Sequence, residues 1–180
     1  YTSATLKELQ AIIYTLPKIS DPQVFSEVIG FLGNIKAKGA PAIMIQALID
    51  PDLLPIRTDL CRACWESQLD YSPHLMLFLH LFLTGDYTLA LEAFTVIENT
   101  LLEQVASRTL IDEMIVLLRS SIPDQPEPKR TLAGELVLVR NQALRSIGGG
   151  EAAVRPVLQR LDALTSQLQS AITQTRMQPV

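Results

Sequence analysis

Residues 40–67, APAIMIQALIDPDLLPIRTDLCRACWES, decide the fold. Ala40–Ile49 is apolar at the spacing of a helix, and Asp50–Asp52 supplies turn and helix-starting residues. A second apolar run with helical spacing begins at Ile56. The stretch therefore predicts a helix, a short break and a second helix, with no period-two pattern of a β-strand.

The second helix of this unit recurs twice along the chain. VFSEVIGFLGNI from Val24 and LALEAFTVIENT from Leu89 superpose on IRTDLCRACWES from Ile56 with offsets of 32 and 33 residues. Four sets of apolar positions then coincide: Val24, Ile56 and Leu89; Val28, Leu60 and Ala93; Ile29, Cys61 and Phe94; Leu32, Cys64 and Ile97. Shorter apolar helices precede the flanking copies, at Leu6–Leu16 and His74–Leu83. One hairpin cannot bury both of its apolar faces, so repetition at this period predicts a stack of hairpins.

The stretch Gly39–Cys64 resembles the HEAT-repeat (armadillo-like) family of α-solenoids. Pro41 matches a proline-led first helix, Asp50 the aspartate at the turn, and Arg57 the arginine early in the second helix that ties neighbouring turns together. ACWESQLDYS and GDYTLALEAFTVIEN are similar to uncharacterised bacterial HEAT-like proteins. The resemblance implies an all-α, right-handed α-solenoid of HEAT-like hairpins with no β-sheet.

We expect a single α-solenoid domain over residues 1–180. The clearest HEAT-like hairpins span 6–99, and Lys7, Glu8 and Gln10 are expected to give the first helix a polar outer face. Residues 101–147 predict a less regular helical pair, with helices at 101–119 and 131–147. The proline-rich segment 120–130 between them predicts an exposed loop.

A long terminal helix is predicted over 151–176. Its apolar residues recur at spacings of three and four: Val154, Val157, Leu161, Leu164, Leu168 and Ala171. This heptad seam has two interpretations. It covers the end of the stack by packing on the preceding hairpin, or it forms a self-association or partner helix, which makes a homo-oligomer through the last helix a possibility to test.

Composition restricts the class of partner and the compartment. The formal net charge is −4, so the overall field repels phosphate backbones, and we expect no nucleic-acid partner. The longest strongly apolar run, Leu75–Leu83, has nine residues, whereas a membrane span needs about 20. Two cysteines form no disulfide framework, which favours a reducing, cytoplasmic setting. The chain begins at Tyr1 rather than Met, which leaves open whether a targeting segment was removed.

No familiar catalytic or metal motif emerges. Cys61-Arg62-Ala63-Cys64 falls in the middle of a predicted helix, and its cysteines align with apolar residues of the other two copies. We therefore expect small core residues rather than a redox pair or zinc ligands. His80 lies among leucines and phenylalanine and is expected to be half-buried. We predict no catalytic residue, cofactor or metal ligand.

Polar rows run along the second helices. Glu27, Asp59 and Glu92 superpose, and further polar rows lie one helical turn away on the same face. In HEAT-like proteins the second helices line the concave surface, so the resemblance implies a mildly acidic groove beside Trp65. The candidate partner-binding residues are Glu27, Asn34, Asp59, Arg62, Trp65, Glu66, Asp70, Tyr71, Glu92, Thr95 and Asn99.

These patterns favour a non-enzymatic protein-protein interaction scaffold. Its expected partner is a basic or amphipathic protein or peptide segment, held by Trp65 as an anchor and oriented by carboxylates. A solvated acidic helix face with Trp65 packed on a neighbour is the simpler interpretation of the same rows. The alternative function is an accessory enzyme or chaperone-like protein of the HEAT-like lyase type that holds a small ligand.

Overall fold

The computed structural model describes residues 6–103 and 107–147. In these ranges the protein is all-helical, with short 3₁₀ helices between some of the α-helices and no strand. The α-helices are α1 (Leu6–Thr15), α2 (Pro22–Gly33), α3 (Ala40–Ile49), α4 (Arg57–Ser67), α5 (Leu75–Thr84), α6 (Tyr87–Glu103), α7 (Arg108–Ser121) and α8 (Glu127–Ile147). The all-α prediction is therefore confirmed, and the terminal helix expected at 151–176 lies outside the described residues.

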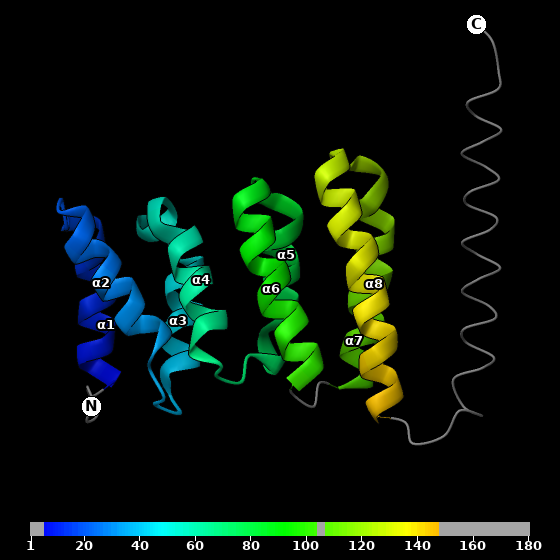
Figure 1. Ribbon diagram of the computed structural model, residues 1–180, viewed down its shortest axis with the longest axis horizontal. Coiled ribbons are helices and arrows are strands. Elements are labelled where there is room, and N and C mark those ends of the chain that lie inside the picture. Colours follow the sequence, from blue (N-terminus) through cyan, green and yellow to red (C-terminus); the bar gives the residue numbers. More distant parts are fainter. Residues whose placement is uncertain (1–5, 104–106, 148–180) are drawn as a thin grey trace, which may run out of the picture. The chain divides into compact units, whose positions relative to one another are not determined.

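The chain divides into two units, residues 1–140 and 141–180, of which the first holds α1 to α7 and α8 as far as Arg140. Its helices follow one another as hairpins in chain order (Figure 1). Among the second helices of these hairpins, α2 packs on α4 and α4 on α6, while among the first helices α1 packs on α3 and α5 on α7. Each hairpin thus contacts its neighbours in the sequence.

Local capping explains where several helices begin and end. The Asp21 side chain accepts hydrogen bonds from the backbone N–H groups of Gln23 (2.8 Å) and Val24 (3.3 Å), and Pro22 occupies the first helical position. Asp50 likewise accepts from the backbone of Asp52 at 2.9 Å, where α3 ends. These are turn signals that the sequence carries.

Most of the apolar positions in the repeat register are buried. All four register positions are buried in the second hairpin, from Ile56 just before α4 to Cys64, and in α6, and Ile29 and Leu32 are buried in α2. Val24 is exposed, however, and Val28 is half-buried. The apolar stripe therefore forms the core from α4 onward, while part of it lies open on α2.

The last hairpin differs from its prediction in two places. The helix expected over 101–119 is two elements, because α6 continues to Glu103 and α7 begins after Ser107, whose hydroxyl accepts from the backbone of Leu110 at 3.4 Å. The loop expected at 120–130 is largely helical, with a 3₁₀ helix at Ile122–Asp124 and α8 beginning at Glu127. Prolines fit the first turn of such helices, because backbone N–H groups there have no intrahelical partner.

No described helix combines the length and the apolar character needed to cross a membrane.

Candidate functional site on the second helices

A hydrogen-bonded cluster joins two of the second helices. Glu92 on α6 accepts from Arg62 Nε at 3.1 Å through one carboxylate oxygen and from Trp65 Nε1 at 2.7 Å through the other. Both donors lie on α4, three residues apart and therefore on one face of that helix. The sequence predicts Arg62 and Glu92 in the polar rows and Trp65 beside them, and the structure brings the three side chains into contact.

The cluster is packed at its centre and open at its edge. The Glu92 side chain is 12% exposed and that of Arg62 is 40% exposed. Asp59, one turn earlier on α4, lies 3.8 Å from Arg62. The hydrogen bond to Glu92 raises the pKa of Arg62 further above its ordinary value, so the guanidinium stays charged. Charge-assisted bonds of this kind are about twice as strong as neutral ones, so the cluster ties α4 to α6.

A close approach joins α2 to α4 on the same layer. A Cβ atom at Gly33 would lie 2.5 Å from Oε2 and 2.9 Å from Cβ of Glu66, so the glycine leaves room for the glutamate. Glu66 is half-buried as a result. Glu66, a predicted contact residue, therefore also sets the distance between α2 and α4.

Several other predicted contact residues already make local hydrogen bonds. Asn34 donates to the carbonyl of Gly30 at 2.7 Å, and Thr95 donates to that of Leu91 at 3.0 Å. Glu27 is exposed and accepts from Gln23 at 3.2 Å. Their side chains lie at the surface of α2 and α6, where a partner has access to them.

The C-terminal end of α4 departs from the prediction. Tyr71 is 1% exposed, its ring packs edge-on against Phe78 with centroids 5.6 Å apart, and its hydroxyl lies 3.5 Å from that of Ser67. Tyr71 is therefore a core residue and cannot touch a partner. Asp70 is exposed but accepts from the backbone of Ser72 at 2.9 Å, which makes it a turn-forming residue.

The cysteines and histidines form no candidate metal site within the described residues. Cys61 and Cys64 are fully buried free thiols, as expected, and burial raises the pKa of Cys64 to about 12 and that of Cys61 well above its ordinary value. His80 is exposed rather than half-buried. Within 6–103 and 107–147, no three His, Cys, Asp or Glu side chains converge as metal ligands would.

The turn at Asp50 is joined to the first hairpin. Asp50 accepts a hydrogen bond from the hydroxyl of Tyr14 on α1, which lowers the pKa of Asp50 and raises that of Tyr14. Nε of Arg57 is buried without a hydrogen-bond partner among the described atoms. The bond from Tyr14 joins the first hairpin to the second, and no local pattern announces it across 36 residues.

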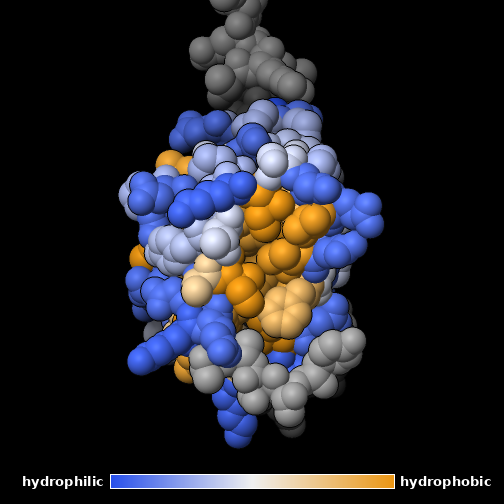
Figure 2. Space-filling model, turned by 90° about the vertical axis from the view of Figure 1, so that its left-hand side faces the viewer, coloured by the Kyte–Doolittle hydropathy of each residue, from blue (hydrophilic) through white to orange (hydrophobic). Residues whose placement is uncertain are grey.

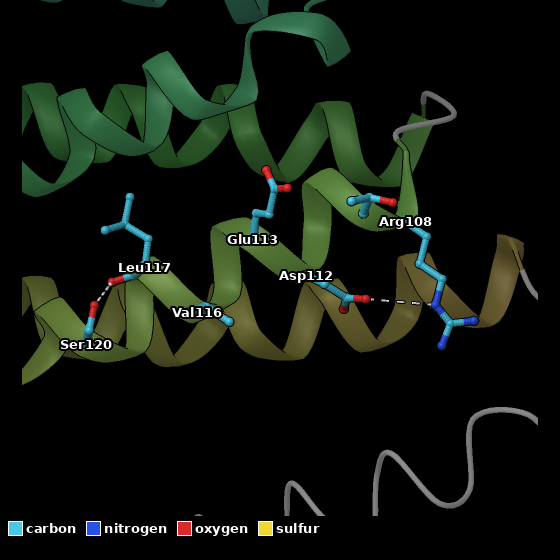
Figure 3. Close-up of a pocket in the computed structure, with 7 residues that line it drawn as sticks. Arg108, Asp112, Glu113, Val116, Leu117 and Ser120 are labelled. Atoms are coloured by element: carbon cyan, nitrogen blue, oxygen red, sulfur yellow. Dashed lines mark hydrogen bonds and ion pairs between the residues drawn. The ribbon is translucent and has the colours of Figure 1, made fainter.

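The cavities that lie between described helices are too small for an organic ligand. Two crevices, one beside Trp65 and one between α5, α6, α7 and α8, hold about 10 Å³ each. A larger space of about 720 Å³ is bordered in the described part of the chain by α7 alone (Figure 3). There Arg108 lies 3.9 Å from Asp112, and Val116 and Leu117 supply the apolar part of the helix face. The described residues that border this space therefore lie on one helix.

The fold and this cluster together define an all-helical protein in which polar side chains join successive second helices. Comparison with protein-family models, with curated proteins and with solved structures gave no match for this chain.

Proposed function

We propose that this chain is a non-enzymatic, HEAT-like α-solenoid scaffold that binds a basic or amphipathic protein segment across the surface of α2, α4 and α6. Its two free, buried thiols suit a reducing compartment, and we place it in the cytoplasm. The proposal rests on the second helices, whose side chains make the contacts described above.

The observation that carries the proposal is the way Glu92 is held. Because Arg62 and Trp65 both donate to it, the α4–α6 surface is fixed before any partner arrives. A surface of this kind loses little conformational entropy on binding. Trp65 remains half-buried, so part of its ring is open to a partner.

The charge of the surface favours a basic partner. Beside Arg62 on α4 lie the carboxylates of Asp59 and Glu66, both of which interact electrostatically with its guanidinium. Asp59 is 32% exposed and Glu66 is half-buried, so both can meet a lysine or arginine of a partner. Complementary charge of this kind steers association and sets its specificity.

The small-ligand alternative has less support. The two crevices between described helices are about the size of one water molecule, whereas ligand pockets typically hold about 300–1,000 Å³. The one reported space in that range is bordered by α7 alone among the described residues. Protein binding needs no such pocket, because a helical face supplies the contact area.

The test is affinity capture from source-cell lysate with three forms of the chain. The binding variant is Asp59→Asn with Glu66→Gln, which removes two charges from the surface while leaving the Glu92 cluster in place. The matched control is Glu113→Gln with Glu135→Gln, which removes two exposed charges from α7 and α8. We expect a partner retained by the wild type and the control to be lost or weakened with the binding variant.

The chain's single tryptophan gives a second readout. A recovered partner should change the fluorescence of Trp65 on titration, since the indole lies at the centre of the proposed surface. Identical partners for all three forms, with no fluorescence change, would contradict the proposal.

A further inference from the structure

Part of the apolar surface of α2 is open to solvent. Val24 is 45% exposed and Phe31 41% exposed, and Val28 between them is half-buried. They follow one another at spacings of four and three, so they form one stripe along the helix. Figure 2 looks onto the α1–α2 end of the first unit, where hydrophobic residues gather between hydrophilic rims.

The same positions are buried in the other second helices. In the repeat register they correspond to Ile56 just before α4, to Leu60 and Ala63 on α4, and to Leu89, Ala93 and Val96 on α6, all of which are buried. α4 packs on α2 and α6 on α4. The open stripe is therefore the position at which α2 would receive a helix, as α4 and α6 receive theirs.

The direction of the stripe agrees with this assignment. Gly33 follows Val24 by nine residues, or two and a half helical turns, so the two lie on opposite sides of α2. Gly33 faces Glu66 of α4. The stripe consequently faces away from α4.

The register also gives the chemistry of the missing helix. Glu27 borders the stripe and corresponds to Glu92, which accepts from Arg62 of the preceding second helix. A helix on the stripe should therefore offer apolar residues at spacings of three and four, with a cation beside them to meet Glu27.

The sequence contains one stretch of this kind outside the described residues. Over 151–176 the seam from Val154 to Ala171 has the required spacing. The heptad positions that flank it are Leu158, Arg160, Thr165, Gln167, Ile172 and Gln174, so Arg160 is the one charged residue among them. We propose that the segment 151–176 of a second copy of this chain docks on the stripe of the first, with Arg160 opposite Glu27.

This contact predicts a particular kind of assembly. It joins two different surfaces, so the copies at the two ends of a linear assembly still have a free stripe or a free seam, and the association continues unless it closes into a ring. The full chain, of 19.9 kDa, should therefore show a weight-average mass that rises with concentration past that of a dimer. The stripe lies on the side of α2 that faces away from α4, and the test of this contact does not depend on the partner proposed above.

The experiment is sedimentation equilibrium on the full chain and three double variants. The stripe variant is Val24→Gln with Phe31→Gln, and the seam variant is Leu161→Gln with Leu164→Gln. The matched control, Val116→Gln with Leu138→Gln, replaces two exposed apolar residues elsewhere. Circular dichroism and melting establish that each variant is folded.

We expect the stripe and seam variants to remain monomeric alone and to form a one-to-one dimer when mixed, because each supplies the half that the other lacks. The control should associate like the wild type. Glu27→Arg and Arg160→Glu should each weaken association about two- to fivefold, and their combination should restore it.

Three results would overturn the proposal. A wild-type chain that stays monomeric up to about 1 mM has no such contact between copies, including the case in which the seam packs within its own chain. A stripe variant that associates like the wild type removes the stripe from the interface. A seam variant that still self-associates, while the stripe variant does not, identifies a stripe-to-stripe dimer instead.

Discussion

At the scale of single residues, two glycines of α2 differ in what a side chain would meet. A Cβ atom at Gly30 would have no heavy atom within 4 Å, whereas one at Gly33 would overlap Glu66. Glycine in a helix costs stability relative to alanine unless a close approach requires it. Gly33 meets that condition and Gly30 does not.

The replacements Gly30→Ala and Gly33→Ala should therefore have opposite effects. We expect Gly30→Ala to raise the free energy of unfolding by about 0.5–1 kcal/mol. Gly33→Ala should lower it by about 1–3 kcal/mol, since α4 must shift to relieve the overlap with Glu66. Urea denaturation of both variants measures the difference. Stabilisation of similar size by both would show that the α2–α4 spacing is not constrained at Gly33.

The buried thiols make stability depend on pH in the alkaline range. The pKa of Cys64 is about 12 in the folded chain, against an ordinary value of 9.0, because burial disfavours the thiolate. Between these values the folded state binds more protons than the unfolded state. The stabilisation is thus complete below about pH 9 and is lost as the pH rises toward 12, by up to about 1.4 kcal/mol per pH unit.

Cys64→Ala should flatten this dependence. We expect the variant to be less stable than the wild type at pH 7, because it leaves a small cavity, but to lose less stability between pH 9 and 11. Urea midpoints measured from pH 7 to 11 for both proteins give the two slopes. Parallel slopes would mean that Cys64 does not titrate differently on unfolding.

At the scale of elements, Lys129 joins α8 to the turn between α5 and α6. It is 4% exposed, and its ammonium group donates to the carbonyl oxygens of Leu83 at 2.8 Å and Gly85 at 3.0 Å. The same group lies 5.8 Å from the ring centroid of Phe82. Burial lowers the pKa of Lys129, and its ammonium group donates to carbonyl oxygens at the end of α5, where the last carbonyls of a helix have no intrahelical partner.

Lys129→Met should therefore destabilise the protein far more than a surface replacement. We expect a loss of about 2–3 kcal/mol, because two carbonyls and the end of a helix lose a charged donor. Lys18→Met, at an exposed lysine, is the matched control and should change stability by at most about 0.5 kcal/mol. Thermal melts measure the melting temperatures of the two variants. Equal melting temperatures would contradict a stabilising role of Lys129 at the end of α5.

The elements themselves follow closely from local signals in the sequence. The helix predicted at Ala40–Ile49 has those bounds in the structure, because Pro41 and Asp50 mark its two ends. The sequence does not predict the break that precedes α7 and is capped by Ser107, because the apolar residues before and after it follow the same helical period. Burial of Lys129 was also missed, because its partners lie 44 and 46 residues away.

Part of the candidate site was predictable, because the helical period places residues three and four apart on one face. The repeat register placed Arg62 and Glu92 in the polar rows, with Trp65 beside them. It could not tell that their side chains bond to one another, or that Tyr71 turns into the core beside Phe78. Those outcomes depend on the packing of neighbouring helices.

At the scale of the whole molecule, the stability of each described hairpin should depend on its contacts with the neighbouring hairpins in the sequence. The extensive contacts of the described helices are made within a hairpin or between consecutive hairpins. In such arrays stability is close to a sum of local terms and nearest-neighbour terms. The Glu92 cluster is one nearest-neighbour term, since it joins the second hairpin to the third.

Glu92→Ala should therefore loosen α4 and α6 more than α7. Removing the carboxylate breaks two hydrogen bonds, one of them to a charged donor, worth about 1.5–3 kcal/mol. Because amide exchange follows the free energy of local opening, we expect exchange in α4 and α6 to accelerate roughly tenfold to a hundredfold. Glu113→Ala, at an exposed position of α7, should leave all three helices unchanged. Hydrogen exchange followed by mass spectrometry resolves these segments. Equal acceleration from α1 to α7 would instead mean that these helices unfold as a single cooperative unit.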